Sequence, residues 1–149
     1  MTDAELHAER DRLAAAVIET PDDAELNYEC AVAHDRLGLE HEAVPYYVKA
    51  IRQGLPEPQL RSAYLGLGST YRAIGDYPKS MEVFDEGLEL FPDAEELVVF
   101  RAMTLYNLGR AREGVAHLLG VLARTSEDPG VVRYRRAIEF YADHLDETW

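Results

Sequence analysis

The feature that most constrains this chain is a helical hairpin between Tyr64 and Pro92. Apolar residues recur there every three or four positions, both before and after a Gly75-Asp76 pair, and this is the pattern of two helices with one apolar face each. Gly75 can take the left-handed conformation that ends a helix, and Asp76 can cap the next one. Because the turn is only about two residues long, the two helices are predicted to be antiparallel neighbours.

Small residues lie on the facing stripes of this hairpin, at Gly68, Ser80 and Gly87. Glycine inside a helix costs up to about 1 kcal/mol relative to alanine, so its presence needs a reason. Close approach of the two helix backbones supplies that reason. We therefore predict that substituting Gly68 by a bulky residue forces the helices apart.

Weaker copies of the hairpin turn at Gly38 and Gly109. The turn glycines are separated by 37 positions from Gly38 to Gly75 and by 34 positions from Gly75 to Gly109. A single helical hairpin cannot bury its apolar faces alone, so such copies must stack on one another. The sequence thus predicts an all-α solenoid of stacked antiparallel helix-turn-helix hairpins, which offers an extended surface instead of a catalytic pocket.

Spacing and residue type together carry a resemblance to a known family. In YLGLGSTYRAIGDYPKSMEVFDEGLELFP, the tyrosines, leucine, glycines, phenylalanine and final proline fall where the tetratricopeptide repeat (TPR) has its characteristic residues, so the stretch resembles that repeat. Ser80 and Gly87 replace residues that are usually alanine, and Tyr64 replaces a frequent tryptophan. The resemblance implies a right-handed superhelix that acts as a protein–protein interaction scaffold. The chain, especially HDRLGLEHEAVPYYVKAI and LGLGSTYRAIGDY, is also similar to short bacterial proteins of this type that pair as dimers.

We predict one domain over residues 1–149, with about eight helices. Its parts are an N-terminal packing helix (3–20), three repeats (22–56, 57–92 and 93–126) and a C-terminal capping helix (128–146). The helices are expected at residues 3–19, 22–37, 40–53, 58–74, 77–90, 93–108, 111–124 and 130–146. Pro45 lies beyond the first turn of its helix, which predicts a kink or a late helix start.

Two C-terminal apolar stripes are predicted to face inward. In the third repeat the stripe comprises Val98, Ala102, Leu105, Leu108, Gly114, Leu118, Val121 and Leu122. In the capping helix it comprises Val131, Tyr134, Ile138, Tyr141 and Leu145. The outer face of the capping helix is expected to be polar.

Composition restricts the kind of partner. The net charge is −13, which would repel nucleic acid phosphates and anionic membrane surfaces, so neither is an expected partner. No apolar run approaches the roughly 18 residues that a membrane helix requires, and the first residues are charged. The single cysteine suits a reducing compartment. We therefore expect a soluble cytoplasmic protein.

Only one pair of side chains suggests chemistry. Cys30 and His34 lie one helical turn apart, a spacing that could provide half a metal site or a thiol with a base. No second cysteine exists, and both residues fall on the stripe between helices, so we interpret them as core residues. No nucleophile, base and orienting group come together elsewhere. We expect no enzyme activity, cofactor or metal.

The TPR resemblance implies that the first helix of each repeat lines a concave groove. The predicted partner-binding residues are Tyr28, Val32, Leu65, Ser69, Arg72, Val99, Met103 and Tyr106. Of these, Tyr28, Leu65, Val99, Met103 and Tyr106 are expected to form one exposed apolar stripe. The edges of the groove are acidic, with Glu25, Glu29 and Asp35 in the first repeat. A partner protein or peptide with apolar anchors and basic flanks would fit.

One specialised TPR function is disfavoured, and two alternatives to a peptide-binding scaffold remain, a homodimer and an enzyme. One TPR subtype grips carboxylate-ended tails with lysine, asparagine and arginine, but the corresponding positions here hold Tyr28, Val32, Glu96 and Phe100, which disfavours it. A self-associating homodimer with no separate peptide ligand is the alternative to a peptide-binding scaffold. An enzyme would need a site that the sequence does not reveal.

Overall fold

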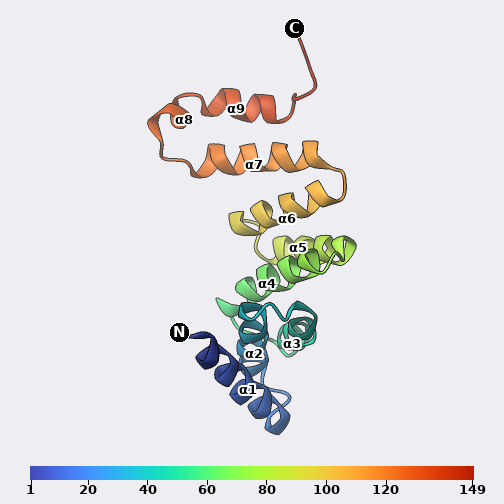
Figure 1. Ribbon diagram of the computed structural model, residues 1–149. Coiled ribbons are helices and arrows are strands. Elements are labelled where there is room, and N and C mark those ends of the chain that lie inside the picture. The colour runs from blue at the N-terminus through green and yellow to red at the C-terminus, as the bar shows by residue number, and fades with distance from the viewer.

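The computed structural model describes all residues, 1–149, and is entirely helical. Its nine helices are α1 (Asp3–Glu19), α2 (Ala24–Arg36), α3 (Glu40–Arg52), α4 (Gln59–Ala73), α5 (Tyr77–Leu90), α6 (Glu95–Asn107), α7 (Ala111–Thr125), α8 (Pro129–Arg133) and α9 (Arg135–Ala142). They stack in chain order, and the two termini lie at opposite ends of an elongated molecule (Figure 1). The predicted all-α hairpin solenoid is confirmed.

Three hairpins, α2–α3, α4–α5 and α6–α7, form the body of the solenoid. Each turns at a glycine with positive φ: 68° at Gly38, 84° at Gly75 and 73° at Gly109. A side chain with a Cβ rarely adopts this conformation, so glycine stops each first helix at a defined residue. At the middle turn, the Asp76 side chain accepts a hydrogen bond from the Lys79 amide at 3.3 Å and caps α5.

Small residues allow the helices to approach closely, as the sequence predicts. A Cβ built on Gly68 would lie 2.6 Å from the Phe84 ring, so no larger residue fits without a shift. The Ser80 hydroxyl donates to the Gly68 carbonyl at 2.7 Å and lies 2.8 Å from the Thr104 hydroxyl of α6. A Cβ on Gly87 would touch side chains of both α4 and α6. These positions therefore join the second hairpin to the third, as well as its own two helices to each other.

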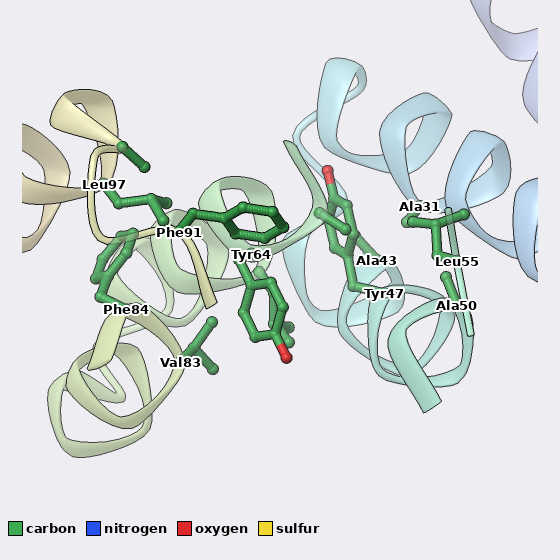
Figure 2. Close-up of a cluster of buried hydrophobic side chains, with 13 residues drawn as sticks. Ala31, Ala43, Tyr47, Ala50, Leu55, Tyr64, Val83, Phe84, Phe91 and Leu97 are labelled. Carbon is green, nitrogen blue, oxygen red and sulfur yellow. The ribbon is translucent and has the colours of Figure 1, made fainter. Parts of the chain in front are cut away.

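The largest buried cluster runs from α2 to the start of α6 (Figure 2). Its members are Ala31, Ala43, Tyr47, Ala50, Leu55, Ala63, Tyr64, Leu67, Val83, Phe84, Phe91, Ala94 and Leu97. A smaller cluster between α1 and α2 contains Leu13, Val17, Cys30 and Ala33. In contrast, α8 and α9 contain no fully buried residue. The core is therefore concentrated in the first two-thirds of the chain.

Pro45 does not delay its helix. The helix α3 begins at Glu40 and continues through Pro45 to Arg52, so the predicted late start is wrong. The longer loop that follows is tied to the core by Leu55, which is buried. Burial of that side chain holds the loop between α3 and α4 against the solenoid.

The predicted single C-terminal helix over residues 130–146 is also wrong. The structure breaks it at Tyr134 into α8 and α9, and α9 ends at Ala142. The Arg135 guanidinium donates to the Ala123 carbonyl at 2.6 Å and to the Ser126 carbonyl at 3.4 Å. These bonds hold the start of α9 against the end of α7, and they satisfy carbonyls that the end of α7 leaves free.

The inward stripe predicted for the C-terminal helix is only partly inward. Val131 and Ile138 are half-buried, whereas Tyr134, Tyr141 and Leu145 are exposed. Because the break at Tyr134 changes the helical register, residues on the two sides of it no longer share one face. The outer surface is correspondingly aromatic and not simply polar.

Candidate functional site

The first helices of the three hairpins, α2, α4 and α6, lie side by side and carry the predicted groove residues. Side-chain hydrogen bonds link them at a sequence separation of 35 residues each. These bonds are Thr70 to Asp35, Arg61 to Glu96, and Arg72 to Asn107. These bonds show that neighbouring first helices contact one another directly along this side.

Most of the predicted groove residues lie in the seams between these helices. Tyr28, Val32 and Leu65 are half-buried and pack against the main core cluster, and Val99 is half-buried as well. The exposed stripe predicted through Tyr28, Leu65 and Val99 is therefore wrong. Neighbouring first helices pack directly on one another, and these side chains fill the space between them.

Other groove residues do reach solvent at the C-terminal end of this side. Met103 is 37% exposed and Tyr106 is 71% exposed, as expected from the sequence. Arg72 is half-buried beside Met103, and Ser69 is half-buried as well. Among the predicted groove residues, the exposed apolar side chains are thus confined to α6.

An open pocket of about 440 Å³ lies beside these residues, between α6 and α7. Its exposed apolar side chains are Met103, Tyr106, Val115 and Leu118, which we call the open α6–α7 face. Arg72 is the only charged residue in the lining. This combination of apolar wall and single charge is typical of a recognition surface.

The open α6–α7 face exists because no following helix covers this side of α7. Tyr47, Phe84 and Leu118 each lie nine positions after a turn glycine, yet they are 3%, 0% and 41% exposed. Tyr47 lies against Gly66 of α4, and Phe84 shares a buried cluster with Leu97 of α6 (Figure 2). The next hairpin therefore covers the first two positions.

Beyond the third hairpin the covering helix is displaced. The helix α9 packs on α7, on the side that carries Ala116, His117 and Gly120. Leu118 lies on a different face of α7 and stays uncovered. The inward positions predicted for Leu118 and Leu122 are therefore wrong, since both are exposed.

A second pocket of about 480 Å³ lies between α7 and α9, and its cations are already paired. Arg101 donates to Asp85 at 2.7 Å, and Arg124 makes two bonds to Glu95, at 2.7 and 2.8 Å. The Arg124 guanidinium lowers the pKa of Glu95 by donating to its carboxylate. This pocket is therefore lined by arginines whose charges are compensated within the chain.

Cys30 and His34 are core residues, as predicted. Both are buried, and the His34 ring stacks on Tyr46 with centroids 5.0 Å apart. The His34 Nδ1 lies 2.7 Å from the Cys30 carbonyl oxygen, which can only accept, so Nδ1 carries the proton. Burial raises the pKa of the Cys30 thiol, so the reactive thiolate is disfavoured.

Asp35 has a structural role that the sequence did not reveal. Its carboxylate accepts hydrogen bonds from Tyr47 at 2.7 Å and from Thr70 at 3.0 Å, so it joins α2, α3 and α4. Burial raises the pKa of Asp35, although these two bonds act in the opposite direction. Asp35 is thus hydrogen-bonded between the first two hairpins and is not a free acidic residue at the edge of the groove.

No group of three or more histidine, cysteine, aspartate or glutamate side chains is placed to hold a metal ion. None of the nine helices combines the length and the apolar character that crossing a membrane requires.

Comparison with known families matches residues 24–145 to the family described as Tetratrico peptide repeat. The chain belongs to this family. The match includes all three hairpins and the helices that follow them, so the resemblance carried by the middle hairpin is confirmed. Repeats of the TPR family generally mediate protein–protein interactions and are typically non-catalytic.

One curated protein with significant similarity is Superkiller protein 3 of Saccharomyces cerevisiae (strain ATCC 204508 / S288c). It is 27% identical over 84 residues, which cover 56% of this chain and 6% of that protein. The similarity is therefore restricted to a small part of a much longer protein.

Proposed function

We propose that this TPR protein is a non-catalytic scaffold that binds a partner protein or peptide at the open α6–α7 face. One observation carries the proposal. The position of Leu118 is buried in the two preceding hairpins but exposed in the third, next to exposed Met103 and Tyr106. Contiguous apolar surface at the mouth of a pocket marks an interaction site, and aromatic residues there supply most of the binding energy.

The partner's chemistry follows from what covers the equivalent faces of the first two hairpins. There, the apolar side of the next helix lies on α3 and on α5. An amphipathic helical segment with apolar anchors suits the same surface on α7. Basic residues would suit only a part of the partner that reaches the other end of the concave side, where Glu25 and Glu29 are exposed.

A homodimer is the second candidate, because the exposed apolar side chains of α6 and α7 are also suited to a second copy of the chain. We further propose a cytoplasmic location, which the single free cysteine, Cys30, supports.

The test combines molar mass with a binding titration. The probe is a fluorescein-labelled amphipathic helical peptide with leucines on one face, glutamines elsewhere and blocked ends. We expect a monomer by light scattering and saturable binding by anisotropy, which Tyr106→Ser weakens and Ile18→Ser, an exposed control on α1, does not. A dimer that Tyr106→Ser dissociates would favour the homodimer instead. Binding unaffected by Tyr106→Ser would place the working surface elsewhere.

A further inference from the structure

Arg72 differs from Arg101 and Arg124, which line the pocket between α7 and α9, because it has no carboxylate partner. Its Nη1 donates to the amide oxygen of Asn107 at 3.1 Å, and its Nη2 lies 3.9 Å from the sulfur of Met103. No carboxylate lies within 4.0 Å of its guanidinium, whereas Arg61, Arg101 and Arg124 each pair with one. Arg72 is thus a half-buried cation with only uncharged partners.

The position of this cation is specific. Arg72 lines the same pocket as Tyr106, Val115 and Leu118, and it is the only charged residue that does so. A ligand seated on this apolar wall therefore has one charged neighbour. Removing a half-buried guanidinium from water without a carboxylate costs free energy, and an incoming carboxylate would offset that cost through charge-assisted hydrogen bonds.

The geometry of the preceding hairpins indicates what shape of ligand fits. Tyr47 and Phe84, equivalent to Leu118, are buried where α4 and α6 cover α3 and α5. In both cases the cover is a helix that presents apolar side chains. On the third hairpin, α9 covers another side of α7, so the equivalent surface remains open.

We propose that the open α6–α7 face binds an amphipathic helix from a partner protein whose apolar stripe is flanked by aspartate or glutamate, and that Arg72 selects for this acidic flank. This inference rests on the proposed function and specifies the partner's charge. It also differs from what net charge suggests, because a chain of net charge −13 should favour basic ligands over acidic ones. At physiological salt, charges more than about 8 Å apart are screened, so Arg72 and not the net charge determines which flanking charge on the partner is preferred.

The experiment uses the full chain and three synthetic probes. Each is an amphipathic peptide of about 16 residues with the same leucine stripe and with blocked ends, so that only the flanks carry charge. The flanking positions hold glutamate, glutamine or lysine. Circular dichroism checks that the three probes have similar helicity, and anisotropy titrations at physiological salt give their affinities.

We expect the glutamate probe to bind about tenfold more tightly than the glutamine probe, as for a hydrogen bond between charged groups. Arg72→Gln should abolish this difference, and Arg72→Lys should retain part of it. The matched control is Arg52→Gln, an exposed arginine of α3 without an ion-pair partner, which should leave the preference unchanged. Leu118→Gln should lower the affinity for all three probes by the same factor.

Several results would overturn the inference. The lysine probe binding most tightly would show that net charge governs recognition. Equal affinities for the three probes, together with loss of binding in Leu118→Gln, would remove the charge selection but leave the proposed function intact. Failure of every probe to bind would reject both. A dimer that Leu118→Gln dissociates would assign the face to a second copy.

Melting curves of Arg72→Gln and Arg72→Lys separate loss of binding from loss of fold.

Discussion

The first two hairpins and the third follow the same local pattern but differ in how their second helices are covered. Tyr47 on α3 and Phe84 on α5 are buried, while Leu118 at the same place on α7 is exposed. The hairpin itself is intact in all three copies. The difference shows that a repeat's central apolar residue is buried by the neighbouring repeat as much as by its own hairpin.

Polar contacts differ between the two regions in the same way. Thr70 bonds to Asp35 and Thr104 to Ser80, so partly or fully buried hydrogen bonds connect the first hairpin to the second and the second to the third. Beyond the third hairpin, the Arg112–Asp146 ion pair has both side chains 69% exposed. Exposed pairs contribute little to stability, so the part-buried bonds from Arg135 to the end of α7 are the main polar contacts that hold the C-terminal helices.

The largest expected effect compares the equivalent positions directly. Phe84→Ala should lower the free energy of unfolding by about 3–5 kcal/mol, because it leaves a cavity in the core. Leu118→Ala should cost less than about 1.5 kcal/mol, since much of its side chain is already in water. Urea unfolding of the two variants gives the comparison. Equal losses would mean that Leu118 is buried in solution, and repeating the measurement at lower protein concentration would reveal a second subunit as the cover.

The next effect tests the close packing of the second hairpin. Gly68→Leu places a side chain where even a Cβ would lie 2.6 Å from the Phe84 ring, so we expect a loss of about 1–3 kcal/mol or more. Glu89 is exposed on α5, and Glu89→Ala should stay within about 0.5 kcal/mol of the wild type. Thermal melts of both variants check this. Equal melting temperatures would contradict the assigned pairing of α4 with α5.

A smaller effect concerns Asp35, the carboxylate that lies between the first two hairpins. Burial raises the folded-state pKa of Asp35 above 3.8, so its ionised form is less favoured in the folded protein. The free energy of unfolding that this group contributes therefore increases as pH falls through the folded pKa. The free energy of unfolding of the wild type, measured relative to Asp35→Asn, should therefore rise as pH falls from 7 toward 3.8. Urea titrations at several pH values measure it.

Glu96 provides the opposite case and serves as the control. Hydrogen bonds from Arg61 lower the folded-state pKa of Glu96 below 4.5. Its stabilising contribution is therefore present above 4.5 and is lost as pH falls through the lowered pKa. Glu96→Gln should be the less stable protein at pH 7 and should approach the wild type in acid. The same direction of pH dependence for Asp35→Asn and Glu96→Gln, each relative to the wild type, would contradict this assignment of the two carboxylates.

The smallest expected effect is a gradient of local opening along the chain. Amide hydrogens of α4 and α5 should exchange slowest, because these helices are covered by the main core cluster. Those of α8 and α9 should exchange faster than those of α7, since α8 and α9 contain no fully buried residue. Hydrogen exchange followed by mass spectrometry resolves the helices. Uniform protection from α4 to α9 would show that the C-terminal end is as well covered as the centre.

Local signals were enough to predict the solenoid and seven of its helices. Turn glycines at Gly38, Gly75 and Gly109 end the first helices, and the boundaries of α2 and α6 differ from the predicted ones by no more than two residues at each end. The same signals failed at Tyr134. The apolar spacing continues through that residue, but the bonds from Arg135 to the end of α7 accompany a break that no local pattern indicated.

The candidate site was predicted in part. Met103, Tyr106 and Arg72 were assigned to the concave side from the TPR resemblance, and all three line the open pocket. Leu118 was not assigned to it, because its position belongs to an apolar stripe that a following helix should cover, and Val115 was assigned to neither the groove nor a stripe. The one available signal was the absence of another glycine turn and hairpin after Thr125.

By itself the sequence determined the hairpins, because helix ends, turns and apolar faces depend on residues a few positions apart. Only the tertiary structure decided which apolar faces stay open and which charges stay unpaired. Leu118 and Phe84 have equivalent local surroundings, and their burial differs because α9 covers another side of α7. Arg72 lacks a carboxylate because the packing of α4 beside α6 places Asn107 and Met103 next to it. Both outcomes depend on contacts between residues distant in the chain.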